Sequence, residues 1–311
     1  MPQMNPAQAR VVDAVLSTAA QGYRNAAMVY QVLFPLVPVS QRGGKILTFG
    51  RESFRIYNTA RSPGQNTRRI QLGHDGAPYV LEQHALEGML PMEINEEATA
   101  SLPGVDMGSA TASTVQDIIE LRTEQFAAGL ATNLANYPAT NKVTLGGTDK
   151  WTDPASKPTQ DIQEAKAAVR AAIGRRPNTV VLSAKAFDAA QENPSIIDRI
   201  KYTGRDTVTT DLLAALWGVQ RVAVGESIYE DASGVMQDCW GGDVVVAYTE
   251  VGSVAERGKP SYGYTYRLSN YPIVEQPYYD RSSKSWIYPV TDELMPVIAG
   301  ASAGFLIKSA A

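Results

Sequence analysis

The chain has 311 residues, of which 44% are hydrophobic and 19% are charged, and its formal net charge is -4. This composition is typical of a folded protein and excludes wholesale disorder, and the charge argues against a strongly basic nucleic-acid-binding protein. The length exceeds what one hydrophobic core usually serves, so we expect two packed regions with extended segments. No apolar run approaches the roughly 20 residues of a membrane helix, so no membrane partner is expected.

The first segments predict one helix and one extended arm. Apolar residues at helical spacing favour a helix over Pro6–Ala20. The apolar stretch Met28–Val39 contains Pro35 and Pro38, which lack the N–H that a helix interior or a central strand uses. We therefore expect this stretch to be an extended arm that lies on another surface.

A long, basic β-hairpin is predicted over Lys45–Leu72, with its turn at Ser62-Pro63-Gly64. An isolated hairpin is marginal in water, so we expect it to rest on another surface, such as a second copy of the chain. Only Glu52 opposes the basic residues of this region, which are Arg42, Lys45, Arg51, Arg55, Arg61, Arg68 and Arg69.

The sign of the charge reverses immediately afterwards, because no Lys or Arg occurs between Ile70 and Leu121. The acidic residues there include Asp75, Glu82, Glu87, Glu93, Glu96, Glu97 and Asp106. Complementary charges across an interface fix register and partner choice, whereas the alternative is that both runs are solvated faces. The contacts that we predict between subunits join Arg51, Arg55, Arg61, Arg68 and Arg69 to Glu82, Glu87 and Glu93.

Helices and strands alternate in the rest of the chain. A helix over Ser113–Tyr137 is predicted from apolar spacing, with a capping box of Ser113 and Gln116 and a stop at Pro138. After a turn-rich connector, a second helix over Thr159–Ile173 ends at Gly174.

The stretch Asn178–Tyr229 is predicted to be a strand, helix, helix, strand unit. Its strands are Thr179–Leu182 and Val219–Val224, a helix covers Ala184–Ile200, and Thr207–Asp211 leads into a capped helix that ends at Gly218. Its polar residues sit at caps and turns, so the unit shows no active site.

Short strands are predicted in the last part of the chain, which makes the fold class mixed α+β. These strands are Asp243–Glu250, Tyr262–Leu268, Ile273-Val274, Trp286-Ile287-Tyr288 and Phe305-Leu306-Ile307.

The residues that could carry chemistry are few, and each has a simpler explanation. His74 and His84 lack paired ligand spacing, and Cys239 is the single cysteine, so no metal and no cofactor are predicted and a reducing cytoplasm fits. Ser183 near Lys185 gives a hydrolase hypothesis, although the spacing does not match S-x-x-K. A DNA-binding module built on the basic hairpin is the other alternative.

Several motifs, taken in order, resemble the major capsid proteins of tailed bacteriophages, which have the Hong Kong 97 fold. The motifs are Leu145–Asp153 with Pro158 and Asp161-Ile162, Pro177–Ser183, Asn193-Pro194 through Ile200–Tyr202, Leu212–Ala214, Val222–Gly225, and the arm from Tyr23–Asn25 to Leu33–Pro35. The resemblance covers nearly the whole chain.

The resemblance implies a structural protein, not an enzyme, that self-assembles as pentamers and hexamers into an icosahedral shell around double-stranded DNA, without sequence-specific DNA binding. It implies an N-terminal arm over residues 1–44, an extended loop over 45–80, a peripheral domain over 81–158 with its spine helix at 113–137, an axial domain over 159–260, and return strands over 261–311. A separate scaffolding protein and a portal are the expected partners, and assembly is expected in the host cytoplasm. An encapsulin nanocompartment of the same fold is the related alternative.

Overall fold

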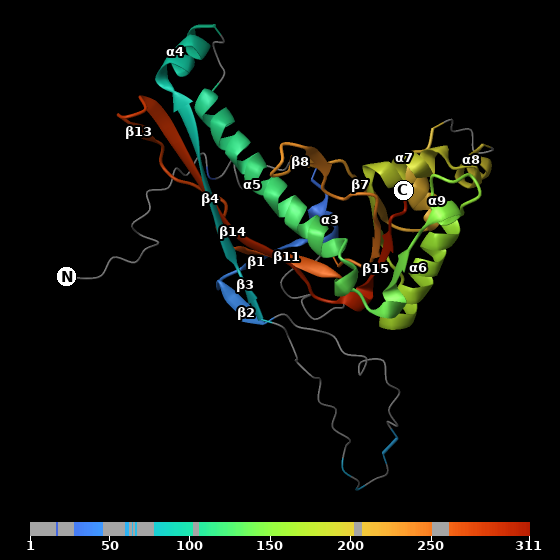
Figure 1. Cartoon of the computed structure of the whole chain (residues 1–311). Helices are drawn as coiled ribbons and strands as arrows, with labels where there is room; N and C mark the ends of the chain where they lie inside the picture. The colour runs from blue at the N-terminus through green and yellow to red at the C-terminus, as the bar shows by residue number, and fades with distance from the viewer. Residues whose placement is uncertain are drawn as a thin grey trace.

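Two β-sheets and one long helix form the framework of the protein (Figure 1). The computed structural model describes residues 17, 28–45, 60–61, 64, 66, 78–101, 106–201, 207–250 and 261–311. Except for Ser17, the predicted helix over Pro6–Ala20 lies outside these residues, as does most of the predicted hairpin over Lys45–Leu72.

The first sheet has six strands and is built around the long strand β14 (Ser285–Ile298). Four strands pair with β14 in antiparallel fashion, and the edge strand β1 (Leu36–Val39) then joins β11 in parallel. The four are β4 (Glu82–Pro91), β11 (Gly263–Leu268), β12 (Ile273–Val274) and β13 (Tyr278–Asp280).

Strand β14 is much longer than the predicted Trp286-Ile287-Tyr288 because it continues through two prolines. Pro296 lies opposite Thr265, whose N–H points away from it to the Pro35 carbonyl (2.9 Å), so the ladder does not need a proline N–H there. Pro289 lies just beyond the β12 ladder, where its carbonyl accepts from the Glu275 N–H (3.0 Å). Proline therefore does not end this strand.

The segment that precedes β1 differs from the extended arm that its prolines predict. It forms the helical turn α3 (Tyr30–Leu33) before it becomes extended as β1. Tyr30, Leu33 and Phe34 are fully buried, so the turn serves as a hydrophobic anchor. Pro38 lies in an edge strand, where its missing N–H is tolerated.

The long helix α5 (Met107–Ala131) crosses the six-stranded sheet and reaches the second sheet (Figure 1). The predicted bounds Ser113–Tyr137 and the predicted capping box are wrong. The helix begins six residues earlier because the Asp106 carboxylate accepts from the N–H groups of Gly108 (3.0 Å) and Ser109 (3.3 Å), so Ser113 is already in its interior.

The C-terminal end of α5 is closed by side chains from later residues. Tyr137 donates its hydroxyl proton to the Ala131 carbonyl (2.7 Å), and Asn136 donates to the Leu130 carbonyl (2.8 Å). The last carbonyls of a helix have no partner inside it, so these bonds satisfy groups that would otherwise need water. Tyr137 belongs to this cap and not to the helix.

The second sheet has five strands in the order β5 (Lys142–Thr144), β15 (Gly304–Lys308), β10 (Val244–Ala247), β6 (Thr179–Ser183) and β7 (Arg221–Gly225). Strands β6 and β10 are buried throughout, which agrees with their apolar sequences. Strands β5 and β15 join this sheet although they lie outside the range 159–260 expected for the axial domain. The chain therefore returns to this sheet at its C-terminal end.

The helices beside this sheet are α6 (Pro158–Ile173), α7 (Ala184–Glu192), α8 (Pro194–Ile200) and α9 (Thr210–Trp217). The expected ends of α6 and α9 are confirmed, because Gly174 and Gly218 adopt left-handed caps with φ of 70° and 63°. The single helix predicted over Ala184–Ile200 is wrong. Asn193 caps α8 through the Ser195 N–H (3.0 Å) and Pro194 follows it, so the chain breaks there.

A buried carboxylate joins α5 to the arm and to the five-stranded region. The side chain of Glu124 is fully buried and accepts from the N–H groups of Val29 (3.1 Å) and Tyr30 (2.7 Å), from the Trp240 indole N–H (2.6 Å) and from the Ser227 hydroxyl (3.5 Å). Ser227 precedes and Trp240 follows the hairpin of β8 (Ile228–Glu230) and β9 (Met236–Asp238). One side chain thus holds three separate segments together.

We predict that Glu124→Gln lowers the free energy of unfolding by about 1–3 kcal/mol at neutral pH, because the amide NH2 of Gln would face an N–H donor and leave it unsatisfied. Urea unfolding of the full chain measures this loss. Glu97→Gln, at an exposed position, is the matched control and should change little.

The same comparison has a predicted pH dependence. Burial raises the pKa of Glu124, so the folded protein binds this proton more tightly than the unfolded chain does. The resulting stabilisation is full below the unfolded-state pKa of about 4.3 and is lost as the pH rises through the folded-state pKa. The difference between wild type and Glu124→Gln should shrink as the pH rises, and a difference that grows would contradict the assignment.

Candidate subunit interface

The outer end of the six-stranded sheet carries an exposed acidic surface. Glu82 and Glu87 lie on β4 and Glu93 lies on the following helix α4 (Met92–Ser101), and all three are exposed. The three predicted acidic residues lie on consecutive elements, but only Glu87 and Glu93 are near the outer end of β4, because Glu82 is at the other end of this ten-residue strand and points to the opposite face of the sheet from Glu87. No Lys or Arg occurs between residues 78 and 101, although the neighbouring turn between β13 and β14 carries the exposed Arg281 and Lys284.

Exposed apolar side chains lie among these carboxylates. We call the acidic residues together with these side chains the outer patch. Met89 is 59% exposed and Ile94 is 51% exposed, which is unusual for residues of their size. The other large apolar members are Leu86, Met92, Tyr278, Tyr279 and Trp286. A mixed acidic and apolar surface of this kind marks an interaction site more often than single scattered apolar residues do.

Two tyrosines of β13 connect the strands of the outer patch. The Tyr278 hydroxyl lies 3.4 Å from both carboxylate oxygens of Glu87, and burial, followed by the Glu87 charge, raises the pKa of Tyr278. Tyr279 contacts the Trp286 ring edge to face, with centroids 5.7 Å apart. These contacts hold β13 and β4 beside β14 while leaving the rings partly exposed.

Of the basic residues in the predicted contact, the structure describes only one. Arg51, Arg55, Arg68 and Arg69 lie outside the described residues, whereas Arg61 is described and exposed. At the base of the segment, β2 (Gly43–Lys45) pairs with β3 (Pro78–Val80) in antiparallel register, with Lys45 opposite Pro78.

Arg42, which belongs to the same basic run, is already paired within its own chain. Its guanidinium donates to both carboxylate oxygens of Glu293, at 2.7 and 2.9 Å. The Glu293 side chain is buried, and these bonds raise the pKa of Arg42. Arg42 thus belongs to the fold of the subunit.

The hydrolase hypothesis is not supported by the geometry around Ser183. Its hydroxyl is buried and accepts from the Ala186 N–H (3.2 Å) as the N-cap of α7, while Lys185 pairs with Asp238 (2.8 Å). A cap hydroxyl without a neighbouring base cannot act as an activated nucleophile. Ser183 and Lys185 therefore have structural roles.

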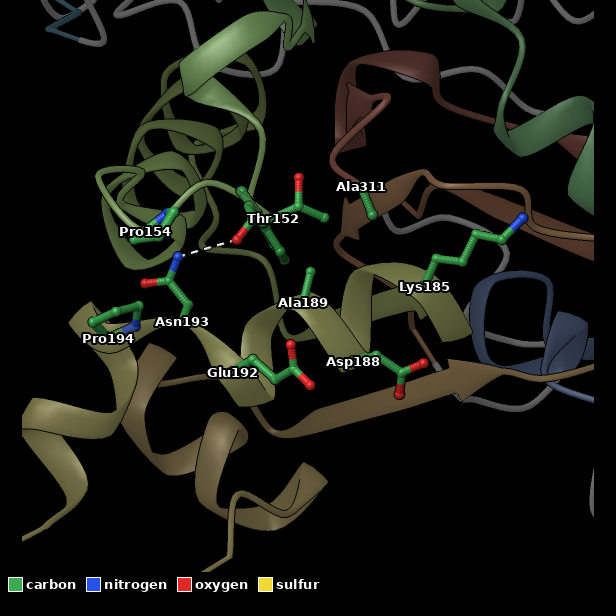
Figure 2. A pocket seen from close by; sticks show the side chains of 10 residues that line it. Thr152, Pro154, Lys185, Asp188, Ala189, Glu192, Asn193, Pro194 and Ala311 are labelled. Carbon is green, nitrogen blue, oxygen red and sulfur yellow. Dashed lines mark hydrogen bonds between the residues drawn. The ribbon is translucent and has the colours of Figure 1, made fainter.

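A hollow of about 460 Å³ lies beside α7 and the start of α8 (Figure 2). The exposed carboxylates of Asp188 and Glu192 stand at its rim, and Asn193 donates from its side chain to the Trp151 carbonyl (3.1 Å). The lining contains no nucleophile paired with a base, so we assign no reaction to this hollow.

The remaining candidates for metal or redox chemistry are also accounted for. Burial lowers the pKa of His84, which faces Arg122 in a small hollow, and burial raises the pKa of the Cys239 thiol. His74 lies outside the described residues. Across the described ranges, no group of three or more His, Cys, Asp or Glu side chains is placed to hold a metal ion.

Sequence reasoning missed two features that matter here. The apolar members of the outer patch were not singled out, although Leu86 and Met89 already interrupt the acidic run. Glu124 was also missed, and its signal is its position on the apolar side of α5, beside the buried Ala127 and Ala128. Within the described part of the chain, no helix is long and apolar enough to cross a bilayer.

Comparison with known proteins gives a consistent set of relatives. Residues 136–284 match the family model of phage major capsid protein E. The chain is 38% identical to the major capsid protein of Burkholderia phage BcepMu over 303 residues, which cover 96% of each chain. It is 29% identical to the major capsid protein of Pseudomonas phage JBD67 over 220 residues, covering 70% of this chain and 69% of that one.

Solved structures agree with this result. A phage-related protein from Bordetella bronchiseptica RB50 superposes with a TM-score of 0.83 at 44% identity, covering 97% of this chain and 99% of that one. The encapsulin SrpI of Synechococcus elongatus superposes with a TM-score of 0.56 at 12% identity, covering 96% and 95%, which shows a shared fold. The predicted fold and family are confirmed: the chain belongs to the major capsid proteins of tailed phages, which are structural proteins of the virion head shell with the Hong Kong 97 fold and not enzymes.

Proposed function

We propose that copies of this chain build a closed shell around phage DNA through contacts between the basic segment 45–80 of one copy and the outer patch of the next. The observation that carries this proposal is the outer patch itself, where Glu87 and Glu93 lie near exposed apolar side chains on β4 and α4, two elements that contain no Lys or Arg. The basic residues of segment 45–80 on a second copy would supply the complementary charge.

Charge complementarity of this kind acts mainly on specificity and on the rate of association. Exposed ion pairs add little to raw affinity, whereas like charges brought together suppress incorrect partners. The apolar members of the outer patch supply burial once a neighbour covers them. The arginines of segment 45–80 would then set the register, and the apolar contacts would keep the copies together.

In the proposed shell, the parts of the chain form the domains that the resemblance implies. Residues 159–260, together with β5 and β15, form the axial domain near the centres of pentamers and hexamers, and the six-stranded sheet with α5 forms the peripheral domain. The shell encloses DNA without binding it tightly, because a chain with a net charge of -4 has no excess of Lys and Arg to neutralise phosphates. A separate scaffolding protein and a portal complete the proposed set of partners.

The encapsulin alternative has less support. The chain shares its fold with the encapsulin SrpI at only 12% identity, whereas the two relatives compared by sequence are both major capsid proteins. Purified particles that hold a cargo enzyme in place of DNA would favour the alternative.

We expect purified full-length protein, alone or with the candidate scaffolding protein, to form closed shells or rings of five and six copies. Electron microscopy of negatively stained samples measures this directly. A monodisperse monomer under every condition would contradict the proposal.

We also expect the double reversal Arg68→Glu with Arg69→Glu to reduce the yield of shells while the subunit stays folded, because the outer patch would then repel the segment. Sedimentation gives the shell yield and circular dichroism gives the fold. The charge-conserving pair Arg68→Lys with Arg69→Lys is the matched control and should assemble. Normal shells from the reversed variant would show that these charges do not set the contact.

A further inference from the structure

Strand β4 has one long edge with which no strand of the described part of the chain pairs. It runs over Glu82–Pro91 and pairs along its whole length with β14, from Glu82 opposite Leu294 to Pro91 opposite Ser285. Among the described residues, β14 is the only strand that pairs with β4. Unpaired N–H and C=O groups along a strand of this length form a template for another strand.

The hydrogen-bond pattern shows which backbone groups face outward. The Met92 N–H donates to the Lys284 carbonyl (3.1 Å), just beyond the pair of Pro91 and Ser285. In an antiparallel ladder the bonded pairs alternate, so the even-numbered residues of β4 bond to β14 and the odd-numbered ones point away. The outward N–H groups are those of Gln83, Ala85, Glu87 and Met89.

The proline at the end of the strand agrees with this assignment. Pro91 has an odd number and lacks an N–H, so it costs the β14 ladder nothing. It also marks the point where the row of outward donors stops. The free edge is therefore a defined stretch that ends where α4 begins.

The side chains beside this edge have a two-residue period. Glu87 and Met89 lie on the face of the sheet opposite α5, whereas Leu86 and Gly88 lie on the face toward α5, where Gly88 approaches Thr111 and Val115. A strand that matches this edge needs a cation opposite Glu87 and an apolar residue opposite Leu86. It must therefore alternate basic and apolar residues.

Within the stretch Arg51–Tyr57, Phe54-Arg55-Ile56 has this alternation and Arg51 continues its basic period, whereas Glu52 and Ser53 depart from it. Antiparallel pairing that sets Arg55 opposite Glu87 also sets Ile56 opposite Leu86 and Phe54 opposite Gly88. The charges of the two strands are complementary, because the edge carries Glu82 and Glu87 and no cation.

We infer that β4 is a strand-addition site, and that the stretch Arg51–Tyr57 of a second copy extends the six-stranded sheet by pairing with its outer edge. This inference rests on the proposed function and specifies how the contact is made. Main-chain hydrogen bonds supply the affinity, and the alternating side chains fix the register. The interface would then form one continuous sheet across two subunits.

Hydrogen exchange of the backbone amides tests the pairing without any substitution. In the free subunit the outward amides of β4 should exchange quickly, while those bonded to β14 are protected. In assembled shells the outward amides should slow by about tenfold or more, as expected for amides that gain a partner. Shells whose outward amides still exchange quickly would overturn strand addition and leave the proposed shell function intact.

A proline at the edge provides the second test. Ala85→Pro removes one outward N–H at an exposed position and leaves the β14 ladder intact, so the subunit should fold but its shell yield should fall about tenfold or more. Ala232→Pro, in the exposed turn between β8 and β9, is the matched control and should assemble normally. Assembly of Ala85→Pro at the wild-type yield would overturn the inference.

Charge exchange tests the named occupant. Glu87→Arg and Arg55→Glu should each reduce the shell yield, and the two together should restore it, because the pair is reformed with its signs exchanged. Restoration by the double variant supports the antiparallel register. The double variant could instead fail to restore assembly although the outward amides are protected in wild-type shells. That result would show that another strand occupies the edge, and it would overturn the assignment of Arg51–Tyr57.

Discussion

The hydrogen bonds that converge on Glu124 are the constraint on which the rest of the structure depends. A buried ionised carboxylate is costly unless donors surround it, and here the donors come from the arm, from the base of the β8–β9 hairpin and from Trp240. None of these groups is near Glu124 in the sequence. The carboxylate is therefore satisfied only when α5, the arm and the five-stranded region have all reached their places, which couples the two sheets through one side chain.

A second buried polar pair fixes the six-stranded sheet itself. The Arg267 guanidinium on β11 donates through Nε to both carboxylate oxygens of Asp292 on β14, at 2.9 and 3.0 Å, and both side chains are buried. Tyr30 lies in the same region, where burial raises its pKa to about 12. Breaking such a pair leaves a buried charge without a partner, so β11 and β14 hold one register. A sheet fixed in this way can present its outer strand β4 without rearranging.

Much of the fold follows from local sequence, and the misses have identifiable causes. Gly174 and Gly218 end their helices as expected because the left-handed cap is a local preference, and apolar runs predicted β6 and β10 correctly. The start of α5 was missed because Asp106 competes with Ser113 as a cap and only the structure decides between them. The length of β14 was missed because a proline is harmful only where its N–H is needed, which depends on the partner strand. The acidic members of the outer patch came from charge patterning, whereas the free edge of β4 depends on sheet topology that no local pattern reveals.

The acidic residues along β4 have a further physical consequence for the free subunit. An exposed strand edge invites pairing with any other chain, and soluble proteins commonly protect such edges with charge. Glu82 and Glu87 repel the same edge of another copy when the two strands approach in parallel and in register, while leaving the outward N–H and C=O groups available. A basic strand removes this repulsion on contact, so one set of carboxylates both prevents the wrong pairing and selects the right one. Specificity in assembly would then come from what the edge rejects as much as from what it binds.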